Sequence, residues 1–200
     1  MFGADHVYRM DVRQMLPLYL DRNADVTVAA VPVPVPIERA SDFGIISAAA
    51  DGRVRGFSEK PQVATPMAGD PARAYASMGN YLFRTFHALA QARERNEHDF
   101  GRHIFPRLVS SQRIYAYDFG RNRTPGVRDY EEPAYWRDIG TMDIYFAAHQ
   151  DVLGREPRFN LFNPNWNVRS SDYQGKVTRI VDSDIHGCMI GDRVLIKGDA

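Results

Sequence analysis

Two aspartates that lie far apart in the sequence could together hold a divalent cation. Asp5 lies in Gly3-Ala4-Asp5-His6-Val7-Tyr8, and Asp138 lies in Tyr135-Trp136-Arg137-Asp138-Ile139-Gly140-Thr141. Mg²⁺ prefers one or two carboxylates together with phosphate oxygens and water, so this pair would suit a bound nucleotide. From the residues alone, Asp5 is equally well interpreted as a turn cap, and Asp138 as a member of a buried ion pair.

The segment Phe57-Ser58-Glu59-Lys60-Pro61 could bind a sugar phosphate. The ammonium group of Lys60 can neutralise a phosphate as a point charge, and the Glu59 carboxylate can accept hydrogen bonds from sugar hydroxyls. Ser77, which opens Ser77-Met78-Gly79, could place a hydroxyl group at the same site. The alternatives are a solvated surface pair for Glu59 and Lys60, which is the more common arrangement, and an ordinary strand start for Ser77.

Other residue types that carry chemistry show no comparable pattern. The sequence contains neither a Walker nor a Rossmann Gly-rich phosphate loop, and no nucleophile has an obvious base beside it. Four histidines lack metal-ligand spacing and are interpreted as structural: His6, His98, His103 and His186. Met78, Met142 and the aromatic residues are assigned to the core.

The composition favours a globular domain over a nucleic-acid-binding or membrane protein. The 200 residues are 44% hydrophobic, and 25 basic residues balance 25 acidic residues. This length predicts one domain with at most a small appendage, and zero net charge disfavours nucleic acid as a partner. No apolar run approaches the roughly 18 residues that cross a bilayer, and the first residues do not form a secretory signal. Cys188 is the single cysteine, which excludes a disulfide framework and favours a cytoplasmic protein.

The two ends of the sequence suggest a portion of a longer protein. Phe2-Gly3-Ala4 is typical of the end of a buried strand. Asp5 would then lie at the carboxyl edge of a parallel sheet, where open α/β sheets bind ligands. At the other end, the chain stops at Gly198-Asp199-Ala200 within a repeating pattern.

Helix and strand signals alternate along the first part of the chain, which predicts an α/β fold. Asp11 can cap a helix that runs to about Arg22, although Pro17 inside it removes a backbone donor. Residues 26–31 are apolar and β-branched at odd and even positions, which predicts a strand covered on both faces. The alternate prolines of residues 31–36 favour an extended edge segment, and a proline-rich docking ligand is the alternative.

A hairpin is predicted next, with strands at 43–46 and 53–58 joined by Asp51-Gly52. Residues 61–74 and 120–134 are predicted loops because Gly and Pro recur in them. The remaining predicted elements are strands at 77–83 and 113–119 and helices at 85–95, 100–109 and 141–153.

The composition changes near residue 156, so we divide the chain into a main domain over 1–155, a linker over 156–182 and a terminal unit over 183–200. Ile190 and Ile196 are six residues apart, and Gly191 follows the first of them. Such a period is typical of a parallel β-helix. A single β-hairpin would produce a similar pattern.

Taken together, these stretches resemble the family of bacterial glucose-1-phosphate adenylyltransferases, and the resemblance covers nearly the whole chain. Each motif is weak by itself, but their common order is highly specific. The matching segments are Gly3–Asp11, Pro34–Glu38, Phe43-Gly44, Phe57–Pro61, Ser77–Tyr81, His98–Gly101, Tyr135–Thr141 and Asn165-Trp166.

The resemblance implies a nucleotide-diphospho-sugar transferase domain of α/β type with a Rossmann-like mixed sheet over residues 1–155. It implies that a left-handed parallel β-helix begins within 183–200. ATP and α-D-glucose 1-phosphate would be the partners, with ADP-glucose and pyrophosphate as products in glycogen biosynthesis. The full-length enzyme would be an allosteric homotetramer.

The resemblance also implies roles for individual residues. Asp5 and Asp138 would bind Mg²⁺ and, together with Lys60, form the catalytic set. The residues that would contact glucose 1-phosphate are Gly44, Glu59, Lys60 and Ser77.

The sequence departs from the family pattern in three places. The Gly-rich loop that carries the ATP phosphates in the family has no counterpart here, the Val31–Pro36 run is a Val-Pro pair longer, and Arg102-His103 replaces the usual Lys or Gly and Asp. We therefore expect the 200-residue chain to be inactive by itself. The alternatives are another sugar-1-phosphate nucleotidyltransferase, making dTDP- or UDP-glucose, and a non-catalytic sugar-phosphate-binding regulatory subunit.

Overall fold

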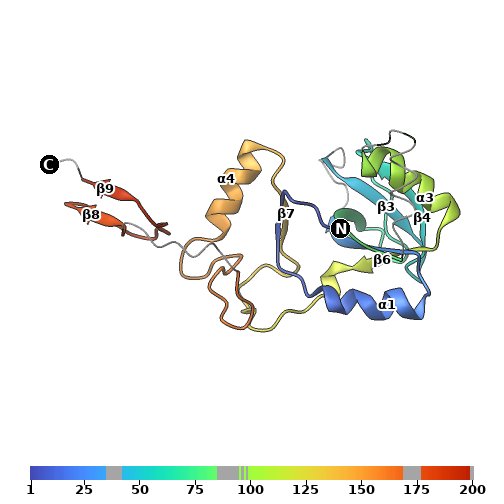
Figure 1. The fold of residues 1–200 in the computed structure, drawn as a ribbon, viewed down its shortest axis with the longest axis horizontal. Coiled ribbons are helices and arrows are strands. Elements are labelled where there is room, and N and C mark those ends of the chain that lie inside the picture. Colours follow the sequence, from blue (N-terminus) through green and yellow to red (C-terminus); the bar gives the residue numbers. More distant parts are fainter. Residues whose placement is uncertain (35–41, 85–94, 96, 98, 169–176, 199–200) are drawn as a thin grey trace.

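The computed structural model describes residues 1–34, 42–84, 95, 97, 99–168 and 177–198. Most of the helix predicted at 85–95 lies outside these residues, as do His98 and the last part of the proline run. Within the described part, the chain forms a mixed five-stranded sheet with helices on both of its faces (Figure 1). This confirms the predicted α/β class.

The main sheet has the strand order β4-β3-β5-β2-β6. Strand β5 is central, and its neighbour β2 pairs antiparallel with it and parallel with the edge strand β6. The hairpin predicted around Asp51-Gly52 is confirmed, because β3 and β4 pair antiparallel. The strands are β2 (Val26–Pro34), β3 (Gly44–Ala48), β4 (Val54–Glu59), β5 (Arg73–Phe83) and β6 (Ile114–Asp118).

Strand β2 is buried where its sequence predicted burial. Its first six residues are buried, as expected for a strand covered on both faces. The parallel pairing with β6 ends at Ala30, so among the described strands Pro32 and Pro34 have a neighbour only on the β5 side. Proline lacks a backbone donor and is tolerated where one side of a strand is free. These two prolines are therefore part of the sheet, which leaves them unavailable as a docking ligand.

The prolines in the predicted helices mark helix starts. The helix predicted from Asp11 divides into a 3-10 helix, η1 (Val12–Met15), and a short α-helix, α1 (Leu16–Asp21), with Pro17 in the first turn of α1. The helix predicted at 100–109 likewise divides into a π-helical segment, η3 (Phe100–Ile104), and α3 (Phe105–Ser111), whose first turn contains Pro106. In the first turn of a helix the missing N–H of proline has no partner to lose.

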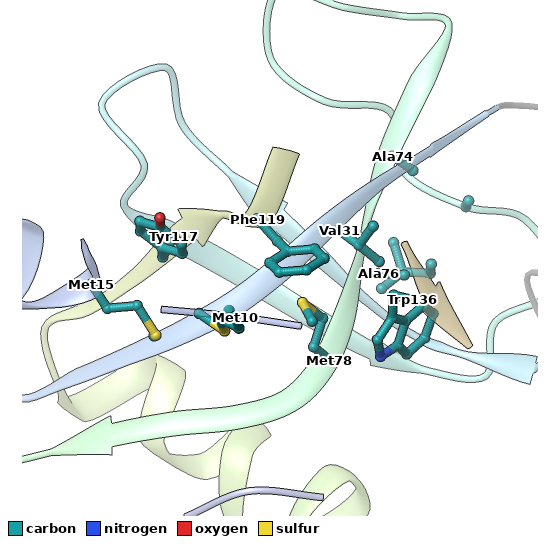
Figure 2. Close-up of a cluster of buried hydrophobic side chains, with 12 residues drawn as sticks. Met10, Met15, Val31, Ala74, Ala76, Met78, Tyr117, Phe119 and Trp136 are labelled. Atoms are coloured by element: carbon teal, nitrogen blue, oxygen red, sulfur yellow. The ribbon is translucent and has the colours of Figure 1, made fainter. Parts of the chain in front are cut away.

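Two hydrophobic cores lie on opposite faces of the main sheet. One contains Ala29 and Val31 of β2, and the other contains Val28 and Ala30, as the alternation of a strand requires. Figure 2 shows the first core, in which Trp136 packs beside Met78 and Val31. The second core lies under α3. The expectation that Met78 is a core residue is confirmed.

Helix α4 (Met142–Asp151) begins where the sequence predicted, because the Thr141 hydroxyl accepts a hydrogen bond from the backbone N–H of Ile144. The expectation that Met142 belongs to the core is wrong, since 79% of it is exposed. Tyr145 and Phe146 are also exposed, and the described chain buries only Ala148 of this helix. The apolar character of a residue on a helix was therefore not sufficient to predict that its side chain is buried.

No strand is described at Phe2-Gly3-Ala4, although the preceding residue, Met1, exchanges two backbone hydrogen bonds with Tyr81 of β5, over 3.0 and 2.9 Å. Phe2 is exposed, and the first strand, β1 (His6–Tyr8), begins after Asp5. It pairs antiparallel with β7 (Trp136–Asp138) in a small separate sheet. Asp5 therefore lies directly before a described strand. Strands of three residues have too few positions to show a period of two, so neither β1 nor β7 had a sequence signal.

Two short strands near the end of the chain, β8 (Arg179–Val181) and β9 (Leu195–Lys197), pair in parallel. A hairpin would require antiparallel pairing, so the hairpin alternative is wrong for these residues. Strand β8 lies within the segment predicted as a linker. The β-helix stays a prediction, since a solenoid needs about three coils. Across the described residues, no helix combines the length and the apolar character that a membrane crossing requires.

Candidate functional site

One open cleft of about 790 Å³ collects every predicted site residue. Its walls come from the N-terminal segment, from β3, β4 and β5, from β7, and from residues 99–101. Residues that are distant in the sequence thus face one space. The predicted site residues that line it are Asp5, Gly44, Glu59, Lys60, Ser77 and Asp138.

The pairing of β1 with β7 brings the two aspartates together. His6 lies opposite Asp138 in this pair, and the backbone N–H of Ile139 donates to the carbonyl oxygen of Asp5 over 2.9 Å. One donor atom each of Asp5, His6 and Asp138 lies within 4.8 Å of the other two. This spacing fits a single divalent cation. The interpretation of His6 as a purely structural residue missed its place between the carboxylates.

The environment of Asp138 favours a cation. Burial raises the pKa of Asp138, and the nearby carboxylates of Asp5 and Asp42 raise it further. His6 and Lys60 act in the opposite direction and lower it. A bound cation would offset the repulsion between the carboxylates. Because the oxygen ligands of this pair match the preference of Mg²⁺, the residues fit the ion that the resemblance implies.

Lys60 follows β4 directly and has an unusual backbone conformation. Its φ angle is +48°, in the left-handed region that residues other than glycine rarely adopt. Its backbone N–H still donates to the carbonyl oxygen of Phe43 over 3.1 Å. Successive residues of a regular strand point to opposite faces, but this conformation ends the alternation, and Glu59 and Lys60 line the same cleft. Such local strain is typical of functional positions.

Two glycines leave space for the carboxylate of Glu59. A β-carbon on Gly44 would lie 2.4 Å from Cζ of Phe57 and 3.0 Å from Oε2 of Glu59. A β-carbon on Gly101 would lie 2.5 Å from the same oxygen. Burial raises the pKa of Glu59, and Asp99 adds to this, whereas Lys60 opposes it. The fold thus holds a carboxylate at a position that is unfavourable for its charge.

Ser77 and Tyr81 form a pair of hydroxyl groups on β5. Their oxygen atoms are 3.3 Å apart, and Ser77 Oγ also accepts a hydrogen bond from the backbone N–H of Gly79. Burial raises the pKa of Tyr81 to about 12, so its phenol is protonated at neutral pH. Tyr81 lines the cleft, although the sequence assigned it no role. The same applies to Asp42, Asp99, Phe100 and Gly101, which the tertiary structure adds to the site.

The network around Arg137 supports β7 from outside the cleft. Arg137 donates to both carboxylate oxygens of Glu132, over 2.9 and 2.6 Å, and through Nε to Asp151 over 3.1 Å. Its guanidinium also lies 4.3 Å from the centre of the Tyr135 ring. Asp138 is the next residue along the strand. The network therefore anchors the segment that presents this carboxylate.

A sequence model of the nucleotidyl transferase family matches residues 1–155 of this chain. Among curated proteins, the chain is 46% identical to the glucose-1-phosphate adenylyltransferase of Thermodesulfovibrio yellowstonii, over 99% of this chain and 49% of the relative. It is 47% identical to that of Anaeromyxobacter dehalogenans, over 96% of this chain and 47% of the relative. It is 44% identical to the Thermus thermophilus protein of the same name, over 86% of this chain and 42% of the relative.

The chain spans about half the length of the curated relatives that it matches. The family match covers the main sheet, the β1–β7 pair and the whole cleft. The mixed sheet and the metal-compatible cleft agree with it. The chain therefore belongs to the nucleotidyl transferase family.

Proposed function

We propose that the full-length protein transfers the adenylyl group of ATP to α-D-glucose 1-phosphate in the presence of Mg²⁺, giving ADP-glucose and pyrophosphate. The main observation behind this proposal is that a pair of carboxylates and a lysine with an unusual backbone conformation face one cleft. The names of the relatives at 44–47% identity support the choice of substrates. A role in glycogen synthesis, a homotetrameric assembly and a cytoplasmic location are further proposals that rest on the resemblance.

The sugar phosphate is bound by the end of β4. Lys60 supplies the positive charge that a phosphate requires. Glu59 accepts hydrogen bonds from sugar hydroxyls, and its burial removes part of its water shell, which raises its pKa. A partly desolvated carboxylate gains more from such hydrogen bonds than a fully hydrated one. Ser77 and Tyr81 add hydroxyl groups on the next wall of the cleft.

The reaction joins two anions. A phosphate oxygen of glucose 1-phosphate forms a bond to the α-phosphorus of ATP, and the bond from that phosphorus to the bridging oxygen of pyrophosphate breaks. When bound to Asp5 and Asp138, Mg²⁺ would offset the negative charge of the two substrates. Lys60 holds the attacking phosphate, and the walls of the cleft orient it. Positioning and charge stabilisation supply most of the catalysis in such transfers.

The function is tested by turnover of the full-length protein with glucose 1-phosphate and ATP, dTTP or UTP in parallel. We expect ADP-glucose as the main product. Faster turnover with dTTP or UTP would support another sugar-1-phosphate nucleotidyltransferase, and binding of glucose 1-phosphate without any turnover would support a regulatory subunit.

The sugar site is tested by the Lys60→Ala variant. We expect its apparent KM for glucose 1-phosphate to rise by about tenfold or more, as for the loss of a charged contact, with a much smaller change in the KM for ATP. Equal effects on the two substrates would contradict the assignment. The Arg55→Ala variant is a matched control, because Arg55 is an exposed cation on β4, the strand that Lys60 follows, and does not line the cleft.

A further inference from the structure

The imidazole ring of His6 is held in a fixed place. Its centre lies 5.3 Å from that of Trp136, at an angle of 78° between the ring planes. On other sides, a β-carbon on Gly3 would lie 3.1 Å from the ring, and one on Gly79 would lie 3.4 Å from it. Only 11% of the His6 side chain is exposed. The slot formed by these neighbours leaves the ring little freedom to turn away from the aspartates.

The Nε2 atom of His6 faces both carboxylates at distances longer than a typical direct hydrogen bond. It lies 3.4 Å from Oδ1 of Asp5 and 3.8 Å from Oδ1 of Asp138. Both distances exceed the usual 2.7–3.2 Å of a direct hydrogen bond. Donor atoms that are about 2.1 Å from one ion and at right angles to each other lie about 3 Å apart. The three donor atoms all lie within 4.8 Å of one another, somewhat farther apart than the ligands of one ion, and small side-chain movements would bring them around it. The other ring nitrogen, Nδ1, is buried.

We propose that His6 is a third protein ligand of the cation and that the Asp5–His6–Asp138 site binds Mn²⁺ more tightly than Mg²⁺. Imidazole suits transition metal ions, whereas Mg²⁺ prefers oxygen ligands only. Two carboxylates and one imidazole form a donor set that accepts a divalent transition metal ion. This inference rests on the proposed function, because that function places a cation between Asp5 and Asp138.

The test measures metal binding to the full-length protein, independently of turnover. Mn²⁺ binding is followed by electron paramagnetic resonance with ADP-glucose present, and Mg²⁺ affinity is obtained by competition. Electron spin echo modulation detects a nitrogen atom bonded to Mn²⁺, and protein labelled with ¹⁵N-histidine assigns it to histidine. The variants are His6→Phe, which keeps a ring in the slot, and His6→Gln, which offers an amide oxygen. His103→Asn is the matched control, because His103 is exposed and lies outside the site.

For the wild type and His103→Asn we expect a histidine nitrogen signal and tighter binding of Mn²⁺ than of Mg²⁺. In His6→Phe the signal disappears and the Kd for Mn²⁺ rises by about tenfold or more, as for other losses at metal sites, while the Kd for Mg²⁺ changes by less than about threefold. His6→Gln loses the nitrogen signal and the preference for Mn²⁺, but binds Mg²⁺ at least as well as the wild type. Circular dichroism confirms that each variant is folded.

Two results would overturn the proposal. If the nitrogen signal is missing in the wild type or persists in His6→Phe, His6 is not a ligand. If His6→Phe weakens Mn²⁺ and Mg²⁺ equally, the ring positions the carboxylates without binding the ion. Turnover of the wild type with Mg²⁺ is measured beside these experiments. Full turnover combined with either result rejects the role of His6 and leaves the proposed function intact.

Discussion

The carboxylate of Glu59 lies directly against Gly101, so that a β-carbon on this glycine would be 2.5 Å from Oε2 of Glu59. Gly101 belongs to the π-helical segment η3, and Glu59 ends β4. Two elements that are distant in the sequence thus meet at the carboxylate to which we assign sugar binding. The absence of a side chain on Gly101 is what permits this contact.

The contact predicts that Gly101→Ala weakens sugar binding. The added methyl group would displace the Glu59 carboxylate, and displacements of about 1 Å can cost a large factor in enzyme efficiency. We expect the apparent KM for glucose 1-phosphate to rise by about tenfold, with little change in the KM for ATP. Gly56→Ala is the matched control, because a β-carbon there would meet only Cβ of Ser47, at an ordinary 3.5 Å. An unchanged KM in Gly101→Ala would contradict the assignment of Glu59.

The raised pKa of Glu59 predicts a trade between stability and function. A carboxyl group with a raised folded-state pKa contributes stability below its unfolded pKa, and this contribution is lost as the pH rises through the folded pKa. At pH 7 the ionised Glu59 therefore destabilises the fold, by less than about 1 kcal/mol after allowing for its solvent exposure. We expect Glu59→Gln to have a slightly higher Tm at pH 7 and to bind glucose 1-phosphate more weakly. Thermal unfolding from pH 7 to pH 4 should show the difference in Tm shrinking. A lower Tm of the variant at pH 7 would contradict this explanation.

The ion pair of Asp25 and Arg113 should stabilise the fold at neutral pH, whereas the ionised Glu59 destabilises it. Asp25 accepts hydrogen bonds from Nε, Nη2 and the backbone N–H of Arg113 over 3.1, 3.0 and 2.9 Å. The side-chain hydrogen bond from Arg113 lowers the pKa of Asp25. Stability from such a group is present above its unfolded pKa and is lost as the pH falls through the lowered folded pKa. We expect Asp25→Asn to reduce the free energy of unfolding at pH 7 by about 1 kcal/mol, since the pair is partly exposed.

This prediction is checked by urea unfolding at pH 7 and at about pH 3. The difference between Asp25→Asn and the wild type should be large at pH 7 and should shrink at the acid end. Asp51→Asn is a suitable comparison, because Asp51 is exposed and accepts a hydrogen bond from the backbone N–H of Arg53. A difference that is independent of pH would mean that the charge of Asp25 does not carry the effect.

The network around Arg137 predicts that replacing this residue affects the metal site. Lysine cannot reproduce the two parallel hydrogen bonds from Arg137 to Glu132. We expect Arg137→Lys to reduce the free energy of unfolding by about 1–3 kcal/mol. The concentration of Mg²⁺ that gives half-maximal turnover should also rise, because β7 presents Asp138 to the cleft.

Unfolding in urea and a titration of turnover with Mg²⁺ measure these two effects. Arg121→Lys serves as the control, because the side chain of Arg121 is 84% exposed and its ion pair with Asp118 is long, at 3.4 Å. If Arg137→Lys lowers stability but leaves the Mg²⁺ requirement unchanged, the network stabilises the fold without positioning Asp138.

The sequence alone was sufficient to predict the parts that depend on local rules. The burial of residues 26–31, the hairpin at Asp51-Gly52 and the cap at Thr141 follow from residue types at neighbouring positions. Burial of Met142 was predicted wrongly, because a residue type does not reveal whether another segment covers it. The strands β1 and β7 were missed, because each gains its hydrogen bonds from a partner at the other end of the main domain.

The candidate site shows the same division. The sequence determined which residues could do chemistry there, since a carboxylate, an ammonium group and a hydroxyl have their properties wherever they stand. Only the tertiary structure decided that Asp5 and Asp138 meet, that His6 lies between them, and that Lys60 turns into the same cleft as Glu59. These relationships depend on strand pairing between distant segments and on a backbone angle that the surrounding contacts impose. Neither is specified by the neighbours of a residue in the chain.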